Sequence, residues 1–369
     1  MAKTLRVQEA EGWVTKDPET IPENRLSPAE IDDNFLAMEE QHTWMGGFKN
    51  RIINGNFGIW QRSTAATSTT GYQSADRWLI SASHNIPVLR RTGIDLGDTC
   101  HTQSLYCLRV NSTADAVAGA YQVISQRIEN VRTFAGKKAV LTFWGYCTTD
   151  RDIAISFRQY FGTGTLGESI RATVNFNGDI KKVAVTDSWQ KYTVVVDVPD
   201  VVYSPFSDIG SYNTDYLQVM FWFSAGSDFD DDTDSLGHQT GQFYLADIQF
   251  ERGDVATEFE RRPLSVEALL CYRYYWKKKI GQVNANAYAD NAIVTYRFWP
   301  PVPMRTIPTA ASVFTGATLS YVDGLTWDVL ETDESNGGLF YFLANTVAAR
   351  TNVYLKFGAD DYVALSAEL

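Results

Sequence analysis

The sequence predicts a mainly β protein: a jelly-roll β-sandwich with an N-terminal arm and helix, a connecting helix and a C-terminal β domain. From residue 51 to about residue 260, short runs rich in β-branched and aromatic residues alternate with turn residues at fairly regular intervals, which favours a sandwich or jelly roll. Two of these runs, YTVVVDV and YLADIQF, alternate with a period of two, as half-buried strands do. The chain has 369 residues, enough for two or three domains.

The first region, residues 1–50, is expected to hold an extended arm followed by one helix. Prolines and frequent acidic residues disfavour a helix before residue 27. The stretch LSPAEIDDNFLAMEEQ then begins a helix with Ser27 as N-cap. Ile31, Phe35 and Met38 form one apolar stripe along it. A single amphipathic helix of about 15 residues is marginal alone in water, so we expect it to mediate attachment or trimerisation.

The second region, residues 51–262, is predicted to be the sandwich. It opens with RIINGNF, interpreted as a first strand, and continues to ADRW. The tryptophans of this opening are typical of packing residues, and its Ser/Thr-rich middle is typical of an exposed loop. Asp76 and Arg77 are adjacent and of opposite charge, and we interpret them as a local ion pair.

The third region, residues 263–369, is predicted to be a helix followed by a C-terminal β domain. FERRPLSVEALLCYRYYWKKK (259–279) is the clear helical interval, with Pro263 able to open it and three lysines at its C-terminal end. Runs such as AIVTYRFW and NVYLKF then have strand character, and PPVPM between two of them is a rigid non-helical link.

Charge and composition exclude several classes of partner. The formal net charge is −12, and an acidic chain repels nucleic-acid phosphates. No stretch approaches the roughly 18 apolar residues of a membrane helix, and the N-terminus lacks the apolar core of a secretion signal. We therefore expect no nucleic acid, no membrane insertion and synthesis in a cytoplasm. The four cysteines favour reduced core thiols there, with a Cys100–Cys107 disulfide as the alternative.

Two motifs resemble ligand sites but lack the required context. GTGTLG (162–167) fits a dinucleotide-binding pattern, yet a strand rather than a helix is expected next, which favours a Gly-rich hairpin loop. DFDDDTDSLGHQ (228–239) resembles a calcium loop without its central glycine or final glutamate. A solvated acidic loop is the simpler interpretation, with loose calcium or magnesium binding as the alternative. The sequence contains neither G-x-S-x-G nor H-E-x-x-H, and we predict that the protein is not an enzyme.

The aromatic residues are the better functional lead, because flat rings stack against the C–H faces of sugars. TFWGY and VMFWF are more typical of a sandwich core. The loop YSPFSDIGSYNTDY (203–216) is polar, carries Pro and Gly, and is more typical of a contact surface. It supplies our candidate glycan-binding residues: Tyr203, Phe206, Tyr212, Asn213 and Tyr216.

Several segments together resemble phage tail fibre and appendage proteins. They are LSPAEIDDNF, NGNFGIWQRS with ADRW, QRIE, DIQFERGDVATEFERRP and the helix CYRYY, in that order, within roughly residues 27–310. The resemblance implies a homotrimeric virion protein whose jelly roll is similar to carbohydrate-binding modules. It also implies attachment to other tail or head proteins through residues 1–50.

In such modules a structural calcium often lies between the first strand and an Asp of the last. The resemblance therefore implies a metal ligand at Asp247, while Gly58 after Phe57 replaces the carboxylate expected there. No other cofactor is expected.

The predicted function is that of a structural phage virion protein: a trimeric tail fibre or appendage that contacts a bacterial surface polysaccharide. One alternative is a purely structural head fibre or tail adaptor without glycan binding. A second is a polysaccharide depolymerase, although those are usually long β-helices with sustained repeats, which this sequence lacks.

Overall fold

The computed structural model describes residues 5–9, 12–16, 48–65, 68–94, 104–164, 170–201, 209–210, 213–279, 282–287, 293–298, 300–306, 308–313, 318–320, 322–333, 337–346, 351–356 and 362–369. By its contacts the chain divides into two units, Met1–Lys49 and Asn50–Leu369. Each unit is described by itself below.

The first unit contains a two-stranded hairpin. Strand β1 (Leu5–Glu9) pairs antiparallel with β2 (Gly12–Lys16), so that Val7 lies opposite Val14. The sequence predicts extended backbone here, and the structure adds the pairing that satisfies its hydrogen-bonding groups. The predicted helix with Ile31, Phe35 and Met38 lies outside the described residues.

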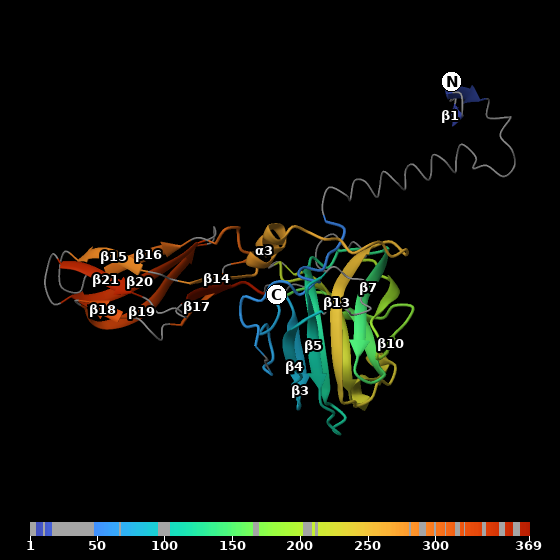
Figure 1. Ribbon diagram of the computed structural model, residues 1–369, viewed down its shortest axis with the longest axis horizontal. Helices are drawn as coiled ribbons and strands as arrows, with labels where there is room; N and C mark the ends of the chain where they lie inside the picture. Colours follow the sequence, from blue (N-terminus) through green and yellow to red (C-terminus); the bar gives the residue numbers. More distant parts are fainter. Residues whose placement is uncertain are drawn as a thin grey trace. The chain divides into compact units, whose positions relative to one another are not determined.

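Two antiparallel sheets form the body of the second unit (Figure 1). The six-stranded sheet has the order β10 (Lys182–Val185), β8 (Arg151–Tyr160), β12 (Tyr216–Ala225), β6 (Tyr121–Glu129) and β3 (Leu79–Ser83), with β9 (Val174–Phe176) paired to β8. The five-stranded sheet has the order β11 (Gln190–Asp197), β7 (Lys138–Cys147), β13 (Gly241–Arg252), β5 (Tyr106–Ser112) and β4 (Val88–Gly93). The predicted fold class, mainly β with a jelly-roll sandwich, is confirmed.

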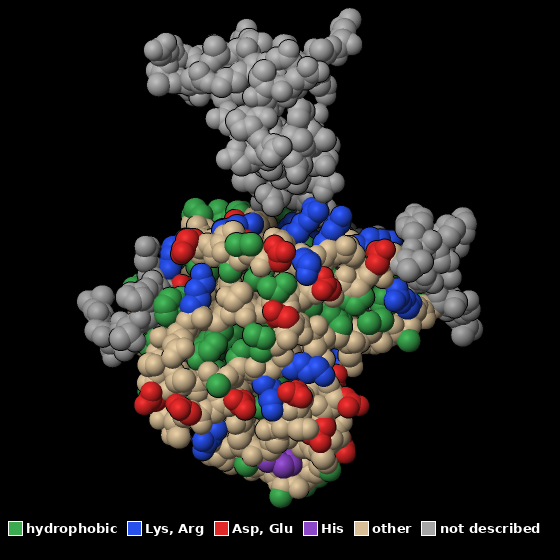
Figure 2. Space-filling model, turned by 90° about the vertical axis from the view of Figure 1, so that its right-hand side faces the viewer, with side chains coloured by type: hydrophobic (Ala, Val, Ile, Leu, Met, Phe, Trp, Pro, Cys, Tyr) green, Lys and Arg blue, Asp and Glu red, His purple; other side chains and the backbone are tan. Residues whose placement is uncertain are grey.

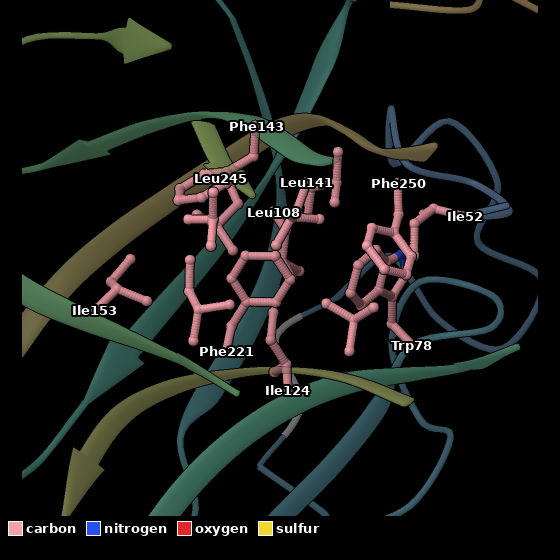
Figure 3. Packing of buried hydrophobic residues seen from close by; sticks show 14 of the residues in the cluster. Ile52, Trp78, Leu108, Ile124, Leu141, Phe143, Ile153, Phe221, Leu245 and Phe250 are labelled. Carbon is pink, nitrogen blue, oxygen red and sulfur yellow. The ribbon is translucent and has the colours of Figure 1, made fainter. Parts of the chain in front are cut away.

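The core fills the space between the two sheets (Figure 3). Phe221 of the six-stranded sheet meets Phe143 of the five-stranded sheet edge to face, with ring centroids 5.3 Å apart. Trp78 lies 6.2 Å from the same Phe221 ring and is fully buried. Burial of each such side chain contributes about 1.5–3 kcal/mol, so this layer is the main source of stability.

The segment before β3 differs from the sequence prediction. RIINGNF was expected to be a strand, but residues 51–57 form no strand, and Asn54 and Phe57 have positive φ angles of 57° and 53°. Side chains replace the missing strand partners: Gln126 accepts from Ile53 N (2.7 Å) and donates to Ile53 O (2.8 Å). Asn54 donates to Ile59 O (2.8 Å) and accepts from Ile59 N (2.9 Å). Residues with left-handed backbone angles end an extended run, and buried side-chain amides then form the hydrogen bonds that a neighbouring strand would have supplied to the backbone.

The connecting helix and the C-terminal β region are also present. Helix α3 (Leu264–Tyr272) leads into three three-stranded sheets. Their orders are β14 (Tyr275–Lys279), β22 (Tyr362–Ser366), β17 (Thr309–Val313); β15 (Gln282–Ala287), β21 (Thr351–Lys356), β18 (Thr318–Ser320); and β16 (Ile293–Phe298), β20 (Gly337–Thr346), β19 (Val322–Asp333).

Three arginines, one of them buried, hold the last residues of the chain against the sandwich. Arg77 forms an ion pair with Glu368 and is 1% exposed, and Arg62 reaches the same carboxylate at 3.0 Å. Arg127 donates to Leu369 O at 2.5 Å. The predicted Asp76–Arg77 pair is therefore wrong. Asp76 instead accepts hydrogen bonds from Gln61, while Arg77 takes a carboxylate from the far end of the chain.

Candidate functional site

The predicted glycan-binding loop is only partly described. Tyr203, Phe206 and Tyr212 lie outside the described residues. Asn213 is exposed, but its backbone oxygen accepts a hydrogen bond from Arg305 Nη1 at 3.0 Å. This end of the loop therefore contacts residues that precede β17.

Tyr216, the last residue of that prediction, lies at the start of β12 and is 7% exposed. Its ring packs on Tyr160 with centroids 4.8 Å apart, and the Arg127 guanidinium lies 4.7 Å from its centroid. Burial raises the pKa of Tyr216, and Arg127 partly offsets this rise. Since Arg127 also holds Leu369, the tyrosine packs within the junction to the C-terminal residues and offers little free surface to a sugar.

The calcium implied at Asp247 does not fit the surroundings of its carboxylate. Asp247 is 3% exposed and accepts a hydrogen bond from Ser104 Oγ. Its other oxygen lies 3.1 Å from Arg261 Nη2 in an ion pair. Calcium takes six to eight oxygen ligands. Within the described residues, no three His, Cys, Asp or Glu side chains come together as metal ligands. A guanidinium thus supplies the positive charge that faces Asp247.

The acidic loop expected over residues 228–239 covers part of the six-stranded sheet. It forms η2 (Ser227–Phe229) and the short helix α2 (Asp230–Thr233). Phe229 packs on Trp222 and Tyr121, with centroids 5.3 and 5.0 Å apart. Trp222 is consequently 4% exposed although it points away from the core. The loop therefore has a packing role besides carrying its charges.

The outer face of the five-stranded sheet carries a different set of side chains. Phe143 of β7 and Phe243 and Leu245 of β13 belong to the core, so the alternating Tyr146 and Tyr244 point to the outside. The strand register then aligns four residues from four neighbouring strands: Arg90, Arg109, Tyr244 and Tyr146. We call these four residues, together with Trp189, the outer row.

The aromatic half of the outer row forms one cluster. Tyr146 lies 5.0 Å from Tyr244 and 5.7 Å from Trp189, and Trp189 lies 6.4 Å from Tyr244, all between ring centroids. All three side chains are half-buried. Such a cluster keeps part of each ring accessible while its neighbours hold it in place, which is the form of an aromatic binding platform.

Polar groups beside the aromatic cluster lack partners. Arg109 Nε and Asn111 Oδ1, both on the outer face of β5, are buried without a hydrogen-bond partner among the described residues. Tyr244 donates its hydroxyl to Gln242 Oε1 at 2.6 Å. Burial raises the pKa of Tyr244, and the Arg109 guanidinium partly offsets the rise. An unpaired buried polar atom costs about 1–3 kcal/mol, so both atoms remain available to hydrogen-bond a water molecule or a ligand.

Sequence reasoning placed TFWGY in the core and missed the outer row. The structure divides that segment: Phe143 is buried, whereas Trp144 and Tyr146 are half-buried on the other face. The alternation within TFWGYC carried the signal, because side chains two apart share one face of a strand. Nothing in the sequence alone aligned Arg109 with Tyr244, since that alignment depends on register.

The described cysteines are all buried. Cys147 and Cys271 are free thiols, which agrees with reduced core thiols at these two positions, and Cys107 lies in the core beside the backbone oxygen of Thr92. Cys100 lies outside the described residues. Among the helices of the described residues, none has both the length and the apolar character needed to cross a membrane.

Charges of both signs are interspersed on the described surface that Figure 2 shows. In that view, neither positive nor negative side chains dominate the whole face. Local pairing therefore decides which charges remain available to a ligand, and the outer row is a place where two like charges lie together.

Comparisons with known proteins concern the fold. No family model and no curated protein matches the sequence. Among solved structures, the enzymatically active domain of bacteriophage CBA120 tailspike protein 4 matches with 13% identity over 56% of this chain and a TM-score of 0.31. This chain spans 22% of that protein.

Two sugar-binding proteins are covered over nearly their whole length. A putative sugar binding protein from Bacteroides thetaiotaomicron has 13% identity, with 55% of this chain and 100% of that chain covered and a TM-score of 0.32. A family 11 carbohydrate-binding module from Clostridium thermocellum, in complex with a mixed-linked tetrasaccharide, has 9% identity, coverages of 53% and 99%, and a TM-score of 0.30.

Proposed function

We propose that this protein is a structural virion component, a homotrimeric phage tail fibre or appendage that contacts a glycan of the bacterial surface. Residues 1–50 attach it to other tail or head proteins after its synthesis in the host cytoplasm. The ordered segments that resemble phage appendage proteins support the virion role. The sandwich supplies the glycan contact.

The outer row is the observation that carries the glycan-binding proposal. Tyr146, Tyr244 and Trp189 offer neighbouring ring faces, and Arg109 and Asn111 place unpaired polar atoms beside them. Sugars combine apolar C–H faces with hydroxyl groups, which suits flat rings flanked by amide and guanidinium groups. The proposed contact surface thus moves from loop 203–216 to this sheet face.

The same groups favour binding without catalysis. The five side chains of the outer row itself carry guanidinium, phenol and indole groups and no carboxylate. Glycoside hydrolysis ordinarily uses two carboxyl groups that flank the scissile bond. Amides and guanidinium groups orient a ligand, whereas proton transfer near neutral pH needs a group with a suitable pKa.

A glycan array with the full-length protein, followed by affinity measurement on bacterial polysaccharides, tests the proposal. We expect Tyr146→Ala to weaken the affinity by about 30-fold, because removal of a central aromatic contact typically costs about 2 kcal/mol or more. Tyr272→Ala is the matched control, since Tyr272 is half-buried on α3 and lies outside the outer row. It should leave the affinity unchanged.

Other outcomes would favour the alternatives. A folded protein that binds no host envelope polysaccharide would point to a head fibre or tail adaptor. Release of reducing ends from a polysaccharide would point to a depolymerase. Light scattering that shows a monomer at micromolar concentration would contradict the trimeric attachment account.

A further inference from the structure

We infer that the outer row binds an anionic glycan, one whose sugar units carry carboxylate groups. This inference rests on the proposed glycan-binding function and names its ligand class. Its starting point is the basic end of the row. Arg90 of β4 lies directly opposite Arg109 of β5 in the antiparallel register, on the same face as Tyr244 and Tyr146.

Two arginines in this arrangement repel each other. Like charges directly opposite on neighbouring strands are destabilising, and a guanidinium stays charged at any ordinary pH. Among the described residues, neither Arg90 nor Arg109 has a carboxylate partner, and Arg109 Nε has no hydrogen-bond partner. Arg77 and Arg273, in contrast, are paired with Glu368 and Glu129. Other described arginines, such as Arg132 and Arg151, also have no carboxylate partner; what distinguishes Arg90 and Arg109 is that they lie directly opposite each other, so a bound anion would relieve their repulsion.

The acidic groups on this face lie elsewhere or are engaged. Glu251 of β13 is 3% exposed, and its carboxylate accepts hydrogen bonds from Thr257 N (2.9 Å) and from the Thr257 hydroxyl. Asp197 pairs with Lys138 at 3.4 Å. Lys138 begins β7 and Tyr146 lies eight residues further along, about 27 Å at strand spacing.

The loops next to the aromatic end of the outer row carry two acidic side chains. Asp150 follows β7 and accepts a hydrogen bond from the backbone of Asp187, which lies just before Trp189. These acids are on the β11 side of Tyr146, whereas both arginines are on the opposite side. The two arginines therefore lie at one end of the row, while the aromatic end is bordered by charges of both signs, because exposed Lys191 of β11 lies opposite Trp144.

Arginine chemistry favours a carboxylate at that end. A guanidinium binds a carboxylate through two parallel N–H···O bonds, and such charge-assisted bonds are about twice as strong as neutral ones. Adjacent strands are about 4.8 Å apart, so the backbones of Tyr244 and Tyr146 lie about 5 and 10 Å from that of Arg109 across the sheet. A sugar carboxylate can thus meet the arginines while the adjoining rings of the chain stack on the tyrosines.

The test uses an array of bacterial polysaccharides that includes carboxylated, phosphorylated and neutral polymers, with carboxyl-reduced copies of every carboxylated binder. We expect binding to carboxylated polymers, and at least about a tenfold loss on reduction, because hydrogen bonds to charged groups contribute about 1.5–3 kcal/mol. Arg109→Gln should cause a similar loss. Arg132→Gln, at an exposed loop arginine, is the matched control and should leave the affinity unchanged.

The experiment distinguishes a wrong carboxylate assignment from an absence of glycan binding. Equal binding to native and reduced polymers, or binding only to neutral or phosphorylated polymers, would overturn the carboxylate assignment while glycan binding stands. A folded protein that binds nothing on the array would overturn both.

Stability provides a readout that needs no ligand. If Arg90 and Arg109 repel each other, Arg109→Gln should keep or raise Tm at low salt, by about 2 °C per kcal/mol of relieved repulsion. The gain should shrink at high salt, because exposed charges are screened. A Tm that falls by several degrees would show that Arg109 supports the fold, which would contradict its role as a ligand-binding residue.

Discussion

Substitution of Glu368 by Gln tests how the end of the chain is held. Glu368 receives both Arg77 and Arg62, the latter at 3.0 Å, and its side chain is 8% exposed. Glutamine has nearly the same shape and keeps one oxygen acceptor, but it removes the negative charge. Its amide would also direct N–H groups toward a guanidinium. The buried Arg77 charge would then lack a counter-charge.

The structure sets the size of the expected effect. Removal of one partner from a buried ion pair costs about 3–5 kcal/mol, because the remaining charge stays buried. Arg77 keeps two other contacts: its Nη2 donates to Arg127 O at 2.6 Å, and its guanidinium lies 3.4 Å from the Tyr274 ring centroid. We therefore expect the lower end of the range, about 3 kcal/mol off the free energy of unfolding.

Urea unfolding at pH 7, followed by tryptophan fluorescence, measures this difference. The control is Asp197→Asn, which breaks the exposed Lys138–Asp197 pair and should change the free energy of unfolding by less than about 1 kcal/mol. The double variant Arg77→Met with Glu368→Met should lower the free energy of unfolding by at least about 1 kcal/mol less than the sum of the two single variants, because the two residues are in contact.

Equal effects of Glu368→Gln and Asp197→Asn would refute the reasoning. Such a result would mean that water reaches the Arg77–Glu368 pair and screens it as at the surface. Additive single and double variants would likewise show that the two side chains do not depend on each other.

Two further predictions concern the opening segment of the sandwich. Burial raises the pKa of Asp76 from 3.8 to about 6, so this group stabilises the fold below pH 3.8 and the contribution is lost as pH rises through about 6. From pH 5 to pH 7.5, the free energy of unfolding should therefore fall by about 1–2 kcal/mol more in the natural protein than in Asp76→Asn. An equal fall in the two proteins would contradict this. Gly55→Ala should lower Tm by several degrees, because its new Cβ would lie 2.1 Å from Ile248 O. The control is Gly93→Ala, whose Cβ would meet no atom within 4 Å and which should change Tm little. Similar Tm shifts for the two variants in calorimetry would refute the close approach at Gly55.

Local pattern was enough to predict much of the architecture. Period-two alternation and the turn residues between runs predicted a sandwich, and its strands are confirmed from β3 to β13. The helix predicted over residues 259–279 is present but shorter: α3 spans Leu264–Tyr272, and the lysine-rich end, predicted to be helical, forms strand β14 (Tyr275–Lys279) and pairs with β22. These features depend on neighbours in sequence, which is why propensity and periodicity reveal them.

The failed strand at residues 51–57 shows where local pattern stops. RIINGNF has apolar residues in a strand-like run, yet the side chains of Asn50 and Gln126 accept hydrogen bonds from the backbone of Ile52 and Ile53. Gln126 is 73 residues away from its partner Ile53. A sequence pattern cannot indicate which distant amide will satisfy a given backbone group.

The sequence by itself determined the β class and the presence of the connecting helix, because these follow from residue-to-residue periodicity. Tertiary structure alone decided the partners. It gave Arg77 a carboxylate 291 residues away and placed Arg90, Arg109, Tyr244 and Tyr146 in one row across four strands. Register fixes such alignments, and a shift of one residue would move every side chain of a strand to the other face.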